Sequence, residues 1–369
     1  MEITGVRSIL IRIPLERPVR IATREVRWRE YVLVFVTAAD GRQGVGYTYV
    51  GTVGGSMVRA AVDDVLTPIL VGADADLIEA RWGAMWQEGL LVGRRGALLR
   101  AMSAVDIALW DLAASRAGLP LFRHLGGFRP EVPAYASGGY YIAGKGLDGL
   151  AQEMRRYLAA GFTSVKIKVG GVPLAEDVAR VKAAREAIGP EVRLALDANN
   201  AYRDAGEAVR AARAFAPYDI WWFEEPLAPD DIPGHAAVAA ATSIPVATGE
   251  IHASRWDFRD LLLQRAARIL QPDAGVLGGV SEWVKVAHTA ASFHVPVAPH
   301  WHADLHVHLV GAVANALTVE YFFLEEDIYN FGRILRERLR PGHGQLRIPE
   351  RPGIGLALDH EAVERYAVR

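Results

Sequence analysis

Ionisable residues stand at the ends of a series of short apolar runs in the second half of the chain. From Lys168 to His300, successive members of this series are 23 to 29 residues apart, about the length of one strand and one helix. Because the carboxyl ends of parallel strands meet at one edge of a sheet, we expect these side chains to converge on one space. The series comprises Lys166 with Lys168, Asp197, Glu224 with Glu225, Glu250, Asp273, His300 and Glu320.

Three members of the series, Asp197, Glu224 and Glu250, are carboxylates that would repel one another in a shared site. A bound cation removes that repulsion. Three carboxylates with positions left for water or substrate suit Mg²⁺. We therefore predict one Mg²⁺ per subunit on these residues. The alternative is that each residue only caps the helix that follows, because acidic side chains favour helix N-termini.

Two lysines lie in the apolar run 162–171 (FTSVKIKVGG), two positions apart and therefore on one face of a strand. A buried ammonium group is costly unless it is compensated. A divalent cation beside Lys166 and Lys168, and each lysine beside the other, is expected to depress both pKa values and to make a general base near neutral pH. The alternative is an ordinary ion pair with a carboxylate at a strand end.

Asp273 and His300 follow successive apolar runs, so contact between them is expected. A carboxylate that holds one imidazole nitrogen fixes the tautomer and leaves the other nitrogen as an acid or a base. The segment PHWHADLHVHL contains three further histidines. We expect His302, His306 and His308 to be loop or helix residues, because only His300 directly follows the apolar run VPVAP.

The elements that position these residues fall into two kinds. Residues 1 to about 50 predict a β-meander, and residues 56–125 have helical periodicity, which together describe an α+β domain. Beyond this region, short β-rich runs alternate with helix-length segments, which is typical of a (β/α) barrel. The eight runs are VPAYAS, TSVKIKV, VRLALDAN, DIWWFEEP, IPVATGE, ARILQPD, VPVAPH and ALTVEY.

We therefore predict three regions: an α+β capping domain over 1–128, the barrel with the metal and catalytic residues over 129–335, and a segment over 336–369 that packs on the capping domain.

The chain has 369 residues, a formal net charge of −2 and no cysteine. These values give no reason to expect nucleic acid or a membrane as partner and exclude a thiolate site. The default partner is a small molecule. No long apolar block or basic leader is present, so we expect a soluble, cytoplasmic protein.

These features together resemble the enolase superfamily, and within it the mandelate racemase subgroup of mandelate racemase and muconate lactonizing enzyme-like proteins. The resemblance spans nearly the whole chain. Each segment is weak alone, but their order and spacing are specific. The segments are AMSAVDIALWDLAASRAGLPLFRHLGG over 101–127, then KIK, LDANN, FEEP, TGE, QPD, APH and LTVEY. The resemblance implies an α/β fold, a modified (β/α)8 barrel of (β/α)7β type with an α+β capping domain.

The resemblance also implies roles for individual residues. Asp197, Glu224 and Glu250 correspond to the Mg²⁺ ligands, and Asp273 with His300 to an acid/base dyad on one face of the substrate. On the other face, Lys168 corresponds to the base and Lys166 to a partner that touches the substrate carboxylate. Glu320 is similar to a glutamate that hydrogen-bonds the developing enolate oxygen, and Asn199 to a contact of metal-bound substrate. We also expect a homo-oligomer.

The implied chemistry is removal of the proton α to a carboxylate, which leaves an enediolate that a metal and hydrogen-bond donors must stabilise. If His300 then protonates a β-hydroxyl, water leaves and a 2-keto-3-deoxy acid results. If His300 returns a proton to the α-carbon, the enzyme is a racemase or epimerase of a 2-hydroxy acid. Acid-sugar dehydratases are the more frequent members of this type, so we favour a lyase acting on a small-molecule carboxylate, an aldonate or aldarate.

Polar residues near the amino terminus are candidates for substrate binding. We expect Thr23, Arg24 and Tyr47 to contact the hydroxyls or a second carboxylate of a sugar acid, because an aryl substrate would require an apolar lining. The alternative is a solvated surface strand.

Two other classes of protein stay open. One is a metal-dependent hydrolase that uses the histidine-rich segment with Zn²⁺. The other is a barrel that keeps the metal site without catalysis.

Overall fold

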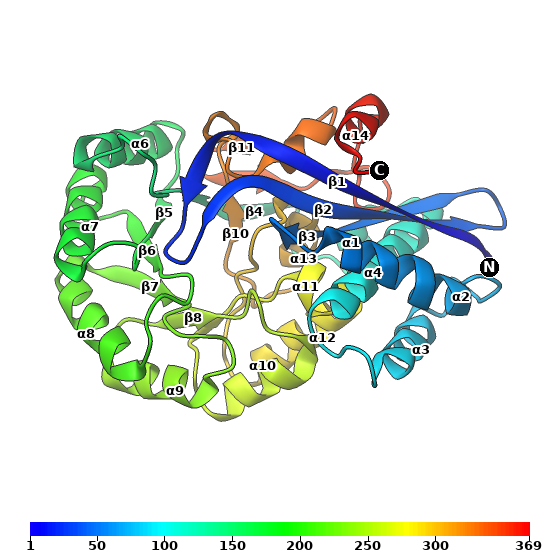
Figure 1. The fold of residues 1–369 in the computed structure, drawn as a ribbon, viewed down its shortest axis with the longest axis horizontal. Helices are drawn as coiled ribbons and strands as arrows, with labels where there is room; N and C mark the ends of the chain where they lie inside the picture. The colour runs from blue at the N-terminus through cyan, green and yellow to red at the C-terminus, as the bar shows by residue number, and fades with distance from the viewer.

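The amino-terminal residues form a three-stranded antiparallel sheet, here the capping sheet, in a computed structural model that describes all 369 residues (Figure 1). Within 31–36 of the middle strand, odd-numbered side chains pack into the core shared with the barrel, and even-numbered ones pack against helices of the capping unit. This alternation buries both faces of the strand. The strands are β1 (Ile3–Arg20), β2 (Glu25–Ala38) and β3 (Gln43–Gly51).

Helices cover the outer face of the capping sheet. The longest of them, α4, packs along β3, where Gly44 and Gly46 allow the two backbones to approach closely. The meander and the helices agree with the predicted α+β character. The helical elements are α1 (Gly55–Ala60), the π-helical turn η1 (Ala61–Leu66), α2 (Thr67–Leu70), α3 (Ile78–Gly89), α4 (Ala97–Arg116) and α5 (Leu121–His124).

Substituting Gly46 by alanine is expected to destabilise the capping unit. A Cβ at this position would lie 1.9 Å from the carbonyl oxygen of Ala104 and 2.6 Å from the amide nitrogen of Ala108. Backbone atoms cannot rotate away, so α4 would have to shift, at a cost of about 1–3 kcal/mol or more. Urea unfolding measures the loss. Gly5→Ala in β1 is the matched control, because its added Cβ meets nothing within 4 Å; an equal loss in both variants would contradict this explanation.

The second unit is a ring of parallel strands surrounded by helices (Figure 1). Seven strands pair in the order β10, β4, β5, β6, β7, β8, β9. They are β4 (Glu131–Ser137), β5 (Ser164–Lys168), β6 (Arg193–Asp197), β7 (Ile220–Glu224), β8 (Val246–Thr248), β9 (Ile269–Leu270) and β10 (Val319–Tyr321). The helices between them are α6 (Leu147–Ala159), α7 (Leu174–Ile188), α8 (Ala205–Phe215), α9 (Ile232–Ala241), α10 (Ser254–Leu263), α11 (Ala274–Leu277), α12 (Gly279–Ser292) and α13 (Ala303–Ala312).

The predicted strand VPVAPH is reduced to single-residue bridges. Val297 pairs in parallel with Leu270 on one side and with Ala316 on the other. Pro296 and Pro299 lack the amide hydrogen that a ladder requires, so this segment cannot pair continuously. The fold is therefore the expected α/β type with a capping unit, but the hydrogen-bonded ladder does not close around the ring.

The carboxy-terminal segment contacts both units. Strand β12 pairs antiparallel with β4 of the ring, whereas the amide of Val368 donates to the carbonyl of Leu10 in the capping sheet. The short elements here are the 3-10 turns η3 (Leu324–Glu326) and η4 (Asn330–Ile334), β11 (Pro341–Gly342), β12 (Gln345–Arg347) and α14 (His360–Tyr366).

The capping unit is fixed over the ring by contacts at two places. The far end of the β1–β2 hairpin extends over the barrel (Figure 1). There Arg20 exchanges backbone hydrogen bonds with Tyr141 of the barrel. Beneath β3, the hydroxyl of Thr48 donates to the carbonyl of Gly275, 2.5 Å away. No helix of the chain is both long and apolar enough to cross a bilayer.

Candidate active site

The register of the parallel strands brings the predicted residues level with one another. Lys168 at the end of β5 is the pairing partner of Asp197 on β6, and Asp197 is the partner of Glu224 on β7. Lys166 stands two residues before Lys168 and points to the same face. The strand ends therefore converge as the spacing predicted.

Each lysine forms an ion pair in this group. The Nζ of Lys166 lies 2.6 Å from Glu224 Oε1 and 2.8 Å from Glu320 Oε1. The Nζ of Lys168 donates to Asp197 Oδ2. All five side chains are buried, so these pairs offset the cost of removing the ammonium groups from water.

The expectation of depressed lysine pKa values applies to a site that holds a divalent cation; without the cation, both lysine pKa values are raised. Burial lowers the pKa of Lys166, but Glu224 and Glu320 outweigh burial and hold it well above its ordinary value. Asp197 likewise outweighs burial and raises the pKa of Lys168. Without the cation, the lysines form the ion pairs with carboxylates that were the stated alternative. A second cation that engages the charge of Asp197 would weaken the effect that raises the pKa of Lys168.

The three predicted metal ligands meet. Asp197, Glu224 and Glu250 each place one oxygen within 4.8 Å of the others. Glu250 has no lysine partner, and its Oε2 accepts no hydrogen bond although it is buried. Burial, followed by repulsion from Glu225 and Asp197, raises the pKa of Glu250 well above its ordinary value. An oxygen-only donor set with an unsatisfied buried carboxylate fits Mg²⁺.

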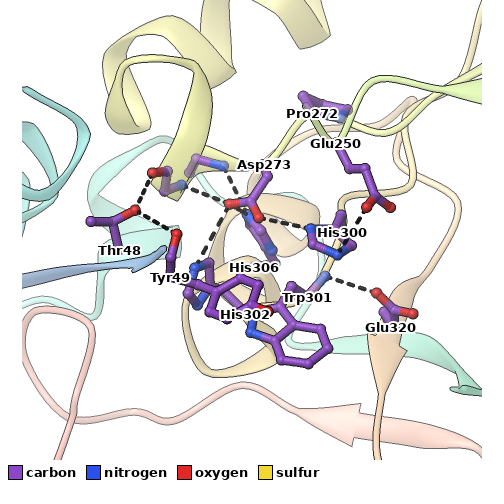
Figure 2. Close-up of polar contacts among 12 residues, drawn as sticks. Thr48, Tyr49, Glu250, Pro272, Asp273, His300, Trp301, His302, His306 and Glu320 are labelled. Carbon is purple, nitrogen blue, oxygen red and sulfur yellow. Dashed lines mark hydrogen bonds and ion pairs between the residues drawn. The ribbon is translucent and has the colours of Figure 1, made fainter. Parts of the chain in front are cut away.

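Asp273 and His300 form the predicted dyad (Figure 2). His300 Nδ1 lies 2.9 Å from Asp273 Oδ2, and Asp273 Oδ1 accepts the amide hydrogen of Gly275 at 2.7 Å. Burial would raise the pKa of Asp273, but His302 and His300 outweigh burial and hold it below the usual range. An anionic Asp273 keeps a proton on Nδ1. The other ring nitrogen, Nε2, lies 3.6 Å from Glu250 Oε1 and is left for a ligand.

The remaining histidines are loop or helix residues, as expected from the sequence. His302 precedes α13, and His306 and His308 lie within it. Figure 2 shows His302 across Asp273 from His300 and His306 beside the Asp273 carboxylate; the Nε2 of each lies 3.9 Å from Asp273 Oδ1. The Nε2 of His306 accepts the amide hydrogen of Ala274 at 3.1 Å, and burial lowers the pKa of His306 to about 3. None of these histidines joins the carboxylate group, so the structure does not form the histidine-rich site that a zinc hydrolase would require.

Glu320 contacts both Lys166 and a backbone amide. Its Oε2 accepts the amide hydrogen of Trp301 at 2.9 Å, and its Oε1 pairs with Lys166. Burial would raise the pKa of Glu320, but Lys166 and His300 outweigh burial and lower it to about 2. In the chain alone Glu320 is therefore an anion that accepts hydrogen bonds, and it does not carry the proton with which a glutamate would donate to an enolate oxygen.

A cavity of about 150 Å³ lies between the strand ends and the capping sheet. Predicted residues reach it from both sides: Lys168, Asn199, Glu250 and His300 from the barrel, and Thr23 and Arg24 from the hairpin. Tyr47 was predicted to line this cavity and does not. Its ring is fully buried and stacks on Phe331, with ring centres 4.4 Å apart.

The cavity has further lining residues beside the predicted substrate contacts. Tyr49 lies two positions after Tyr47, on the same face of β3 but nearer the strand end. In the sequence, only the alternation of side chains along β3 could have indicated that Tyr49 shares the face of Tyr47. The backbone gives another signal, because Asn199, Asn200, Glu225 and Trp301 have positive φ values, which are strained for the latter two residue types. The other lining residues are Arg29, Tyr49, Arg100, Tyr140, Asn200, Glu225 and Trp301, of which Glu225 belongs to the predicted series of strand ends.

The two tyrosines give a matched pair of substitutions. Tyr49→Phe removes the hydroxyl that accepts from Arg29 Nη1 at 2.6 Å in the cavity wall. We expect kcat/KM to fall about tenfold, because a hydrogen bond to a charged group contributes about 1.5–3 kcal/mol. Tyr47→Phe removes a hydroxyl outside the cavity and is expected to leave kcat/KM unchanged. Steady-state kinetics of both variants test this, and the reverse order would return Tyr47 to the site.

Comparison with known proteins adds two family matches. Residues 4–126 match the mandelate racemase / muconate lactonizing enzyme N-terminal domain. Residues 149–363 match the enolase C-terminal domain-like family. Together these matches cover most of the chain.

Individual relatives span nearly the full length. A 3,6-anhydro-alpha-L-galactonate cycloisomerase of Streptomyces coelicolor is 38% identical over 367 residues, 99% of each chain. An arabinonate dehydratase of Saccharolobus solfataricus is 34% identical over 344 residues, 91% of this chain and 90% of the relative. The solved structure of L-talarate/galactarate dehydratase from Salmonella typhimurium LT2, liganded with Mg and L-lyxarohydroxamate, is 33% identical with a TM-score of 0.92 and covers 100% of this chain and 93% of that one.

Proposed function

The chain belongs to the mandelate racemase and muconate lactonizing enzyme family of the enolase superfamily, and from this we propose that it is an acid-sugar dehydratase. It would remove the proton α to the carboxylate of an aldonate or aldarate and then expel water from the β-carbon to give a 2-keto-3-deoxy acid. The observation that carries the proposal is one cavity lined by Lys168, His300 and Glu250. A base, an acid and a metal ligand thus face the same ligand.

Lys168 and His300 reach the cavity from strands that are not adjacent. Between β5 and the Val297 segment lie two strands, β4 and β10, on one side of the ring. We propose that the Nζ of Lys168, as the neutral amine, takes the α-proton. The electron pair left on the α-carbon forms the enediolate and then breaks the β-carbon–oxygen bond. His300 Nε2 gives its proton to the departing hydroxyl, and water is released.

The anionic Asp273 supports this donation, because a carboxylate hydrogen-bonded to Nδ1 stabilises the imidazolium. Asp197, Glu224 and Glu250 would hold Mg²⁺. When bound, the ion neutralises these carboxylates, favours the amine form of the adjacent lysine and stabilises negative charge on the substrate carboxylate. Lys166 is paired with Glu320, and its positive charge would attract the same carboxylate.

A second outcome is favoured by the cycloisomerase relative. When the β-oxygen belongs to a ring ether, the same proton removal and carbon–oxygen cleavage open the ring, and the product is an isomer because no water departs. Racemisation requires the third outcome, in which His300 returns its proton to the α-carbon. All three begin with removal of the α-proton. The relatives include a dehydratase of arabinonate, which has one carboxylate, and a dehydratase of talarate and galactarate, which have two. The relatives therefore do not indicate whether the substrate of this chain has one carboxylate or two.

We also propose that the chain assembles with copies of itself. The loop that joins α3 to α4 exposes adjacent apolar side chains, with Leu91 93% and Val92 69% exposed. Val53 and Met57 of the capping unit are exposed too. Apolar groups clustered on a surface favour association between chains. Light scattering of the purified protein measures the oligomeric state.

Proton NMR in D₂O tests the proposed reaction. The purified protein with Mg²⁺ is incubated with a panel of mono- and dicarboxylic sugar acids and 2-hydroxy acids. Conversion of the sugar signals to a 3-deoxy-2-keto pattern would identify the dehydratase and its substrate. Deuteration at the α-carbon without loss of water would identify a racemase or epimerase instead, and the absence of both across the panel would contradict the proposal.

A further inference from the structure

Two guanidinium groups line the capping side of the cavity, and neither forms a salt bridge. We propose that Arg29 and Arg100 bind a second carboxylate of the substrate, so that the preferred substrates are aldarates, which carry a carboxylate at each end. This inference rests on the proposed function and makes its substrate class specific. The capping side of the cavity would then select substrates by the charge of their far end, in addition to the reaction at the strand ends.

Arg29 of β2 is only 3% exposed. Its Nε donates to the carbonyl of Ile328 at 2.6 Å and its Nη1 donates to the hydroxyl of Tyr49 at 2.6 Å. The guanidinium lies over the ring of Trp301, 4.4 Å from its centre. These contacts fix the plane of the group, and they are all with neutral partners. The positive charge and Nη2 are left for a ligand in the cavity that Arg29 lines.

Arg100 enters the same cavity from the first turns of α4. Its Nη1 donates to the backbone carbonyl of Tyr49, so the two arginines hold opposite ends of one residue. Burial lowers the pKa of Arg100 although Asp273 and Glu250 oppose the shift from a distance. A buried cation without a paired anion is unfavourable, and an anionic ligand would relieve that cost.

The two sides of the cavity therefore make different demands. The barrel side offers Lys168 and the carboxylate group for the reacting end of the substrate. The capping side offers Arg29 and Arg100, with Arg24 at the rim. A guanidinium is planar and binds carboxylates through paired N–H donors, whereas a primary hydroxyl gives it neither charge nor a second acceptor. A substrate that extends from one side to the other is bound best when its far end is also a carboxylate.

Paired substrates of one carbon skeleton test the inference directly. Galactarate and galactonate differ only in oxidation at the far carbon, as do glucarate and gluconate. We expect kcat/KM of the unaltered enzyme with Mg²⁺ to be higher for the diacid of a reactive pair. Arg100→Gln and Arg29→Gln should each lower kcat/KM for the diacid about 10- to 100-fold and change that for the monoacid only a few-fold. Arg100→Lys should recover part of the diacid activity.

The control is Arg27→Gln, which removes an exposed arginine paired with Glu25 outside the cavity. Magnesium binding by calorimetry and the melting temperature show whether each variant is folded. Monoacids that react as well as diacids, or arginine variants that lose both activities equally while still binding Mg²⁺, would overturn the inference and leave the proposed reaction intact. If no member of either class exchanges its α-proton, the proposed function fails, and this inference fails with it.

Discussion

Replacing Lys168 by alanine is expected to abolish both exchange of the α-proton and loss of water, with a fall in kcat of about 10³-fold. Lys168 lines the cavity, and its amine is the base that the proposed reaction requires. Removing a positioned general base costs about 10²- to 10⁴-fold. Exchange of solvent deuterium into the α-carbon, followed by NMR, and the rate of keto-acid formation report the two steps separately. Both should fall together, because they share the enediolate.

Lys182→Ala is the matched control for this substitution, since Lys182 is 61% exposed on α7 and far from the strand ends. Loss of Lys168 also leaves Asp197 without its closest cation. Each variant must therefore be shown to bind Mg²⁺ and to melt cooperatively. A Lys168→Ala enzyme that retains wild-type exchange would exclude Lys168 as the base.

Removing magnesium is expected to eliminate activity and to lower the melting temperature. Asp197, Glu224 and Glu250 are buried together, and Glu250 is the one member of the three without a lysine partner. A ligand that binds only the folded state stabilises it by about 2.7 kcal/mol at a concentration of 100 times Kd. Chelation with EDTA, followed by titration with Mg²⁺, should therefore restore turnover and the melting temperature over one concentration range.

Glu250→Gln separates the contribution of Glu250 to Mg²⁺ binding from its repulsion of the neighbouring carboxylates. It should remove the response to Mg²⁺, because one ligand charge is lost, while the metal-free variant should be at least as stable as the metal-free parent. The sign follows from the raised pKa of Glu250: the folded state holds its proton more tightly than the unfolded state, so metal-free stability falls as pH rises above the ordinary glutamate pKa. In Glu250→Gln this contribution is absent. Full activity after chelation, or an unchanged Mg²⁺ response in the variant, would contradict the metal assignment.

The positions of the charged residues were predictable because the repeat is regular. In a parallel sheet, neighbouring strand ends must be level, so a spacing of one strand and one helix placed Lys168, Asp197 and Glu224 side by side. The pairing of Asp273 with His300 followed from the same argument. The family resemblance then gave these residues roles that no spacing could supply.

The sequence did not predict which residue along a strand reaches the cavity. Tyr47 and Tyr49 share one face of β3 because side chains alternate, and the sequence contains no signal for which of them reaches the cavity. Only the packing of Phe331 against Tyr47 decides it. Similarly, VPVAPH has the apolar content of a strand, but its two prolines limit it to isolated bridges.

The pairing of charged side chains within the site was also not predictable from the sequence. The lysine pKa values depend on which carboxylates stand nearest, and the pairing of Lys166 with both Glu224 and Glu320 is a property of the packed site. The same holds for Arg29 and Arg100. Numerous arginines near the amino terminus predicted a solvated strand as readily as a binding site, and only the burial of Arg29 without an acidic partner distinguishes the two.

We propose that Lys168 and His300 act on one substrate at successive steps. Proton NMR of the His300→Asn enzyme with Mg²⁺ and a reactive sugar acid in D₂O tests it most directly. Lys168 should still remove the α-proton, so we expect the α-carbon to become deuterated while no 3-deoxy-2-keto acid forms. Unimpaired formation of the keto acid would contradict the role of His300, and loss of exchange together with dehydration would show that the two residues do not act in sequence.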